Sequence, residues 1–142
     1  MASLQASSKK QVLQELARLA AQHTGLDQRE IYEALQQRER LGSTGFGRGV
    51  AIPHVKLRNL GRTVCLFARL QAPIDFDALD GEPVDLIFLL LSPEHASGDH
   101  LKTLARISRL VREPSTIERL RAARDAVAIH AELTADTATH AA

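Results

Sequence analysis

Residues 84–91 constrain the fold of this chain more than any other stretch of the sequence. They read Val-Asp-Leu-Ile-Phe-Leu-Leu-Leu, so Asp85 is the one charged residue among them. A strand that is apolar at nearly every position is typical of the centre of a sheet that helices cover on both faces. We therefore expect an α/β fold with this segment as a central strand. Asp85 is expected at the mouth of that strand or beside a partner, in a structural role.

Helical and strand patterns alternate before this segment. Apolar residues recur at the spacing of one buried helical face over residues 8–22, with the lysines of this helix outside. Asp27 with Glu30 three residues later forms a capping box, which predicts a second helix to about Arg40. Residues 63–70 are an apolar run that predicts another strand. This alternation favours a mixed sheet in a layered α/β arrangement.

Further helices are predicted after the central strand. His100 is expected to open a helix with a buried apolar stripe. Ser115 with Glu118 forms another capping box and predicts a short helix. Asp125 is expected to cap a last helix, and residues 134–142 are small and polar, so we expect this tail to fray.

The composition indicates one globular domain. The chain has 142 residues, of which 44% are hydrophobic, and a formal net charge of +1. A chain of this size can bury one substantial core, so we expect a single domain over residues 1–142. The near-neutral charge argues against a nucleic-acid partner. No apolar run approaches the roughly 20 residues that span a bilayer, and the N-terminus lacks the apolar segment of a signal peptide, so we expect a cytoplasmic protein without membrane insertion.

A glycine-rich run over residues 41–57 ends in a short apolar strand and presents a histidine, His54. Glycines permit positive φ and let backbone N–H groups approach an anion, and Pro53 fixes how the imidazole is presented. Nucleotide motifs do not fit this run. A P-loop needs Gly-Lys-Ser/Thr, which is absent, and the dinucleotide fingerprint would need glycine or alanine at Val50 and a strand before the loop.

The run and its surroundings resemble the active-site signature of the fructose/mannitol-type enzyme IIA domains of the bacterial phosphotransferase system, most of all their nitrogen-regulatory branch. The matching segments are Arg38-Glu39 before the run, Ala-Ile-Pro-His ending at His54, a Pro-Ile-x-Phe-Asp-Ala turn at residues 73–78, and His100-Leu101. They follow in order at the family's spacing over nearly the whole chain. The resemblance implies a mixed sheet of about five strands with helices on both faces. It also implies a short N-terminal edge strand, which residues 3–6 would only partly supply.

The resemblance implies that His54 is phosphorylated and that Arg38 and His100 stabilise the phosphoryl group. A neutral imidazole accepts a phosphoryl group without an activating base, and the transfer otherwise needs alignment and charge stabilisation. A guanidinium fork matches phosphate oxygens, and a helix start favours an anion. Without the resemblance, Arg38 and Glu39 would be a solvated helix face. We expect the phosphate cradle to be completed by backbone amides of Ser43, Thr44, Gly45, Gly47 and Gly49.

The family also implies protein partners rather than a cofactor or a metal. The donor would be a histidine-phosphorylated carrier of the HPr type, fed from phosphoenolpyruvate by an enzyme I, with Phe46 and Val50 as candidates for its docking surface. The output would be regulation of proteins such as potassium transport systems or sensor kinases by phosphorylation state, without turnover of a small molecule. Val55 replaces the glycine that commonly follows the histidine, and its β-branched side chain is expected to narrow the donor's approach.

Three alternative functions stay open. A IIA subunit of this type could instead pass its phosphate to a fructose/mannitol-type sugar permease, although we expect a free-standing regulator because no permease domain is fused to the chain. A metalloenzyme could use His54, His95 and His100, but the last two are five residues apart rather than at the three or four of one helix face. A non-covalent interaction module would not need His54 at all.

Overall fold

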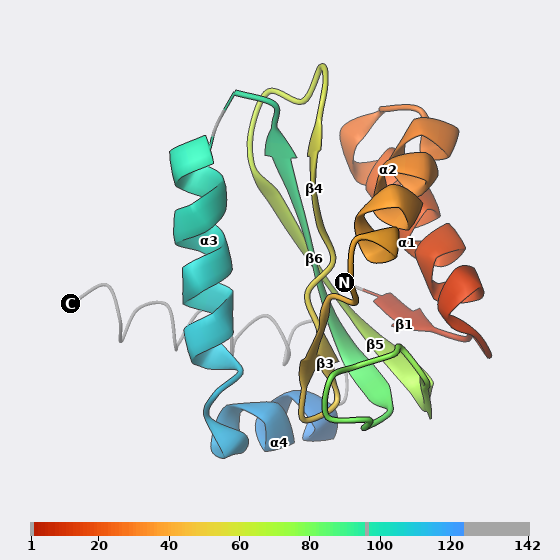
Figure 1. Ribbon diagram of the computed structural model, residues 1–142, viewed down its shortest axis with the longest axis vertical. Helices are drawn as coiled ribbons and strands as arrows, with labels where there is room; N and C mark the ends of the chain where they lie inside the picture. The colour runs from red at the N-terminus through yellow and green to blue at the C-terminus, as the bar shows by residue number, and fades with distance from the viewer. Residues whose placement is uncertain (1, 96, 124–142) are drawn as a thin grey trace. The chain divides into compact units, whose positions relative to one another are not determined.

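A computed structural model describes residues 2–95 and 97–123 of the chain (Figure 1). The predicted helix capped by Asp125 and the predicted frayed tail at residues 134–142 lie outside the described residues. In chain order, the described elements are β1 (Ala2–Leu4), α1 (Lys9–Thr24), α2 (Gln28–Arg40), β2 (Gly45–Gly47), β3 (Val50–Ala51), β4 (His54–Leu57), β5 (Val64–Ile74), β6 (Val84–Pro93), α3 (Ser97–Leu110) and α4 (Pro114–Ala122).

These elements belong to two compact units, Met1–Lys102 and a second unit that begins at Thr103. The first unit holds the whole sheet, α1, α2 and the first residues of α3. Arg38, His54 and His100 all lie in the first unit. The single domain over residues 1–142 stays a prediction.

The sheet is mixed, and β6 lies at its centre. Its strand order is β1-β5-β6-β3-β2, and β4 also pairs with β6. β5 runs antiparallel to β6, with Phe67 opposite Phe88, whereas β3 and β4 run parallel to β6 in succession. Because β3 and β4 together act as one interrupted strand, the sheet has about five strand positions, which agrees with the predicted α/β class.

The central strand β6 is buried because nearly all of its residues are apolar. All residues from Leu86 to Leu91 are at most 1% exposed. Asp85 is half-buried at the start of β6, where its N–H donates to the carbonyl of Gly49 at 3.0 Å. The prediction of a buried central strand with a charge at its mouth is confirmed.

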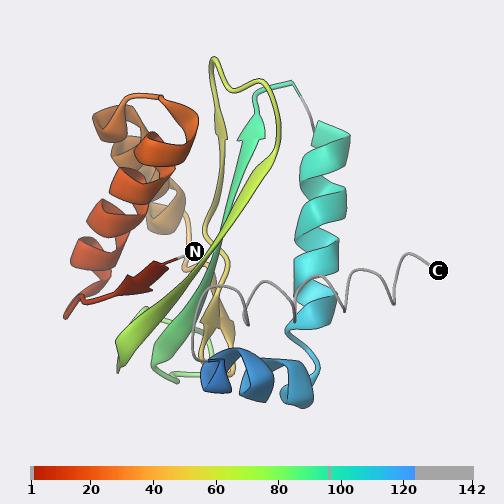
Figure 2. The same cartoon turned by 180° about the vertical axis from the view of Figure 1, so that it is seen from behind.

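Helices α1 and α2 cover one face of the sheet, as Figure 1 and the reverse view in Figure 2 show. The core below them combines apolar residues of both helices with alternate residues of β4, β5 and β6. The residues that the two helices contribute are Val12, Leu13, Leu16, Ala17, Ala20, Ile31 and Leu35.

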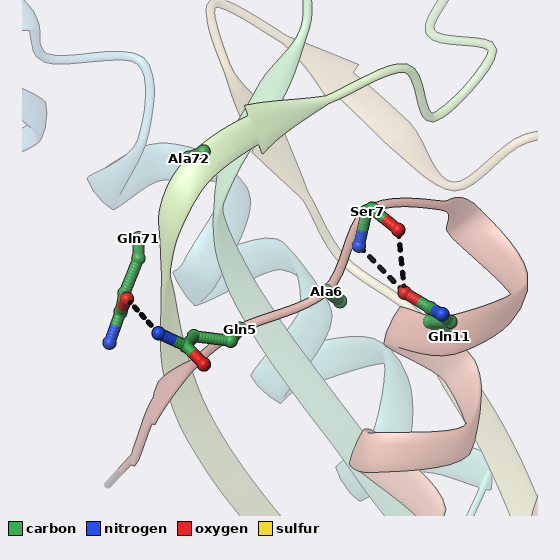
Figure 3. A pocket seen from close by; sticks show the side chains of 6 residues that line it. All are labelled: Gln5, Ala6, Ser7, Gln11, Gln71 and Ala72. Atoms are coloured by element: carbon green, nitrogen blue, oxygen red, sulfur yellow. Dashed lines mark hydrogen bonds between the residues drawn. The ribbon is translucent and has the colours of Figure 1, made fainter.

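The start of α1 is fixed by local hydrogen bonds. Ser8 caps the helix, because its side chain accepts the N–H of Gln11 at 3.2 Å, which confirms the predicted start. The side-chain oxygen of Gln11 also accepts from the N–H and the hydroxyl of Ser7, at 2.8 and 2.9 Å, and Gln5 bonds Gln71 of β5 beside them (Figure 3). These groups line a shallow, uncharged pocket that contains none of the predicted site residues.

The helix predicted after Asp27 starts where expected, but its capping box and two other predicted helix starts need correction. Asp27 is the N-cap of α2 but makes no side-chain cap hydrogen bond, so no capping box forms there. α4 begins at Pro114 with Glu113 as its N-cap, because proline suits the first helical position; the box predicted at Ser115 is wrong. α3 begins at Ser97, so His100 lies in its first turn rather than at its start.

The N-terminal edge strand is present, though short. β1 runs parallel to β5, with Leu4 opposite Leu70. Among the described helices, none combines the length and the apolar character needed to cross a membrane.

Candidate functional site

His54 stands at the break between β3 and β4. The last pair between β3 and β6 is Ala51 with Ile87, and the first pair between β4 and β6 is His54 with Leu90. The two residues between belong to neither strand, and Pro53 has no N–H to donate to a ladder. The Pro53 carbonyl accepts the N–H of Leu90 at 2.9 Å, so the break is still tied to the central strand.

A hydrogen bond to this break determines which nitrogen of His54 carries the proton. Its Nδ1 lies 2.7 Å from the carbonyl oxygen of Ile52. Because a carbonyl only accepts, Nδ1 of the neutral ring must donate, and Nε2 keeps its lone pair. The ring is half-buried. Nε2 is therefore the ring nitrogen whose lone pair is available to an incoming group, a choice between the two nitrogens that the sequence left undecided.

His100 lies next to His54. The two ring centroids are 5.5 Å apart, with an angle of 54° between the ring planes. His100 is 7% exposed, and its Nδ1 lies 2.7 Å from the hydroxyl of Ser92, which is fully buried. Burial, together with the charges of His54 and Lys56, lowers the pKa of His100 below its usual value. At neutral pH the second ring is therefore uncharged, and with Ser92 donating to Nδ1 it can present Nε2–H as a donor.

Arg38 lies in the last turn of α2, as predicted. Its Nη1 donates to the carbonyl of Gly42 at 2.9 Å, which fixes the guanidinium at the start of the glycine-rich run. α2 also packs against β4, the strand that His54 begins. The structure thus brings the two histidines into ring contact and anchors Arg38 at the C-terminal end of α2, a helix that packs against β4.

Several N–H groups of the glycine-rich run bind acceptors inside the protein. The Thr44 N–H donates to both carboxylate oxygens of Glu39, each at 3.1 Å, and the Gly45 N–H donates to the Ser43 hydroxyl at 3.0 Å. The Arg48 N–H donates to Asp80 at 2.9 Å. These amides hold the run in shape, and contacts between the run and a phosphate stay a prediction.

The glycine-rich run contains a strand, β2, that the sequence did not predict, and it forms a hairpin with the following strand. β2 pairs antiparallel with β3. A Cβ on Gly45 would lie 2.8 Å from the Cβ of Ala78, so only glycine fits between this strand and the loop of residues 75–83. Gly47 and Gly49 have φ of 111° and 84°, which lets the chain reverse where other residues would be strained.

The arrangement is suited to transfer of an anionic group to a ring nitrogen. It offers an imidazole with an unprotonated Nε2 and a second uncharged imidazole as donor, and a guanidinium is anchored on Gly42 at the end of a helix that packs against β4. Within the described residues, no three His, Cys, Asp or Glu side chains are placed to share a metal ion.

Comparison with known proteins decides the family. The family model for the phosphoenolpyruvate-dependent sugar phosphotransferase system, EIIA 2, matches residues 1–135. The chain belongs to this family. This IIA protein is 56% identical over 139 residues to a nitrogen regulatory protein of Bradyrhizobium diazoefficiens, an alignment that covers 98% of this chain and 91% of the relative.

Solved structures of IIA proteins share the fold. The nitrogen regulatory protein IIA-Ntr from Neisseria meningitidis superposes with a TM-score of 0.88 at 38% identity, covering 93% of this chain and 92% of that one. IIA mannitol from Escherichia coli has a TM-score of 0.75 at 19% identity, with 92% of both chains covered, which shows the fold alone. The predicted IIA fold and the nitrogen-regulatory resemblance are confirmed.

The sequence did not predict the contacts of three polar residues of this IIA protein, Lys9, Glu39 and Ser92. The side chain of Glu39 is only 6% exposed. Lys9 of α1, which was expected to face solvent, forms an ion pair with it, with 3.1 Å between Nζ and Oε1. The signal available was the Arg-Glu pair of the family signature, in which only the arginine received a role. Ser92 was missed as the partner of His100, although a hydroxyl at the end of an otherwise apolar strand is a sign of a specific contact.

Val55 does not act as the sequence indicated. Its side chain is 7% exposed and belongs to the core below α1 and α2. Since successive side chains of a strand point to opposite faces, it points away from the face that His54 occupies. The expectation that Val55 narrows the donor's approach is therefore wrong.

We expect Val55→Gly to destabilise the protein by about 2–4 kcal/mol, because it removes buried methyl groups and adds backbone freedom. Urea unfolding followed by circular dichroism measures the loss. Lys56→Gly, at the neighbouring exposed position of the same strand, is the control for glycine outside the core, with an expected loss of about 1 kcal/mol. Equal losses in the two variants would show that the buried side chain does not contribute.

Proposed function

We propose that this IIA protein accepts a phosphoryl group on Nε2 of His54 from an HPr-type carrier and controls other proteins through its phosphorylation state. The observation that carries this proposal is the 2.7 Å hydrogen bond between His54 Nδ1 and the Ile52 carbonyl. It holds the ring in the tautomer that can attack phosphorus. Membership of the EIIA 2 family supports the same class of chemistry.

In the transfer step, the lone pair of Nε2 attacks the phosphorus of the carrier's phosphohistidine. The new P–N bond forms as the P–N bond to the carrier breaks, and the electron pair of that bond returns to the carrier's imidazole. No proton has to leave Nε2. The Nδ1–H stays on the Ile52 carbonyl, which stabilises the positive charge that develops on the ring.

Arg38 and His100 are proposed to stabilise the transferring group. Arg38 uses a donor of its fork on Gly42, which leaves further N–H groups for phosphate oxygens. His100 is uncharged at neutral pH and adjacent to the attacking ring, so it can donate a hydrogen bond to the phosphoryl group without repelling the positive charge that develops on His54. Electrostatic stabilisation of this kind supplies most of the catalysis in phosphoryl transfer.

The carrier is proposed to dock on exposed apolar side chains next to the hairpin. Phe46 of β2 is 39% exposed, and Leu79 of the adjacent loop is 98% exposed. The two segments lie side by side, because Gly45 approaches Ala78 closely. Val50 is fully buried, so its predicted role in docking is wrong.

The output is proposed to be regulatory. The 56% identity to a nitrogen regulatory protein favours this function over delivery of phosphate to a fructose/mannitol-type permease. We propose that the targets are proteins such as potassium transport systems or sensor kinases, and that the protein acts in the cytoplasm, where phosphoenolpyruvate is made.

Incubation with phosphoenolpyruvate, enzyme I and an HPr-type carrier tests the proposal. We expect intact-mass spectrometry to show the addition of one phosphoryl group, labile in acid and stable in alkali, and peptide mapping to place it on His54. Absence of any addition with cognate donors, or a phosphoryl group on another residue, would overturn the proposed function.

A further inference from the structure

A continuous series of polar contacts connects α1 with the ring of His54. Lys9 Nζ lies 3.1 Å from Glu39 Oε1, and Glu39 accepts the Thr44 N–H at 3.1 Å. The Thr44 carbonyl accepts the Ile52 N–H at 2.9 Å, and the Ile52 carbonyl accepts the His54 Nδ1–H at 2.7 Å. All five residues belong to the unit Met1–Lys102.

We propose that Lys9 and Glu39 are positioning residues that set the tautomer and orientation of the His54 ring. They touch neither the ring nor a phosphoryl group, and they act through the backbone of Thr44 and Ile52. Their effect on the rate of phosphoryl transfer rests on the proposed function, whereas their effect on the tautomer of the His54 ring does not.

The burial of Glu39 makes this contact series sensitive to substitution. A carboxylate that is 6% exposed needs a compensating charge, and Lys9 supplies it with a side chain that is itself 20% exposed. Lys9 also lies 3.6 Å from Asp77, but that side chain is 73% exposed and contributes little. The Lys9 ammonium lies 4.8 Å from the ring centroid of Phe76, and the Ser8 cap fixes the turn that carries it.

Thr44 transmits the position of Glu39 to the strand break. Its N–H is held by Glu39 and its carbonyl by Ile52, so displacement of the carboxylate shifts both bonds. The direction of the Ile52 carbonyl depends strongly on this anchor, because Pro53 has no N–H with which to fix the next peptide. If the Ile52 carbonyl turns away, Nδ1 loses its acceptor, and the ring can place its proton on Nε2, where it blocks attack.

Nitrogen-15 NMR of the imidazole ring tests the proposal without any phosphoryl donor. In the wild-type protein we expect His54 to show a single tautomer with a protonated Nδ1. In Glu39→Gln and Lys9→Met we expect the Nδ1 proton to exchange with water about 10 times faster or more, with the second tautomer becoming visible. Lys9→Arg keeps a positive charge beside Glu39 and should show the same His54 ring spectrum as the wild-type protein.

Transfer kinetics provide the second readout. We expect Glu39→Gln and Lys9→Met to lower the maximal transfer rate about 10- to 100-fold, the loss typical of groups that orient a reacting ligand, with little change in half-saturation for the carrier. The double variant should be no slower than the slower single variant, because both remove the same constraint. Glu33→Gln is the matched control: Glu33 lies on the same helix in an exposed pair with Arg29, and its loss should change neither readout.

Ring spectra decide between the outcomes. If Glu39→Gln and Lys9→Met alter the His54 ring no more than Glu33→Gln does, the proposal is wrong. If the ring responds as expected but the wild-type protein accepts no phosphoryl group, the positioning stands and the proposed function fails. Should Glu39→Gln not fold, Lys9→Met decides alone, since its position at the start of α1 is partly open to solvent.

Discussion

His54→Ala is expected to abolish phosphoryl incorporation completely, while the protein stays folded. The substitution removes the nucleophile, so no covalent product can form however well the phosphate is held. His54 is half-buried at the first position of β4, and alanine there leaves the backbone pairing with β6 in place. Labelling from phosphoenolpyruvate through the carrier, followed by intact-mass analysis at long times, measures the loss.

Matched histidine variants make this result specific. His23 lies exposed in the last turn of α1, and His23→Ala should label like the wild-type protein. His100→Ala should label slowly but to completion, because it removes a donor and keeps the nucleophile. Full labelling of His54→Ala, or complete loss of labelling in a folded His100→Ala, would show that the two roles are wrongly assigned. Unchanged regulation of a target by His54→Ala would instead favour a non-covalent interaction module.

Arg38→Ala is expected to slow phosphoryl transfer by about 10² to 10³, by analogy with the loss of one charge-stabilising donor in other active sites. Arg38→Lys should recover part of the rate, because a point charge replaces a planar fork of donors. Rapid-quench measurement under saturating carrier separates this loss from weaker docking. Arg38 bonds the Gly42 carbonyl, so circular dichroism and unfolding must show that each variant keeps the fold.

Arg40→Ala is the control for net charge. Arg40 lies on the same helix end two residues later and is exposed, so its loss removes one positive charge without removing a predicted phosphate donor. We expect less than a threefold change in the transfer rate, the size of a surface-charge effect of about 0.6 kcal/mol or less. Equal losses for Arg38→Ala and Arg40→Ala would reduce the role of Arg38 to a general electrostatic one.

Sequence predicted those parts of the fold that local composition determines. Residues 84–91 could only be a buried central strand because almost every position is apolar, and Ser8 marked the start of α1. The strand β2 was missed because glycine is rare in strands; here Gly45 is required by the close approach of Ala78, a residue more than 30 positions away. The capping boxes predicted at Asp27 and Ser115 were wrong, because Asp27 caps α2 without a side-chain hydrogen bond and Glu113 is the N-cap of α4.

The candidate site could likewise be predicted only in part from the sequence. The family signature named His54, Arg38 and His100, and the structure brings the two histidines into contact. It could not indicate that Nδ1 of His54 donates to Ile52 or that Ser92 holds His100, because these bonds depend on the register between β4, β6 and α3. The burial of Glu39 likewise results from packing against α1, which no local pattern records.

The attachment of His54 to the central strand has a consequence for how a phosphorylated form would be recognised. With β4 paired to β6 from His54 to Leu57, and Pro53 bonded to Leu90, the backbone around the histidine has little freedom to rearrange. Because Nδ1 keeps its proton, phosphorylation would place about two negative charges on the phosphoryl oxygens and one positive charge on the ring, on a surface of nearly constant shape. The formal net charge of +1 would fall to about 0. Partner proteins would have to distinguish two electrostatic states of one rigid surface, so their discrimination should weaken as salt concentration rises.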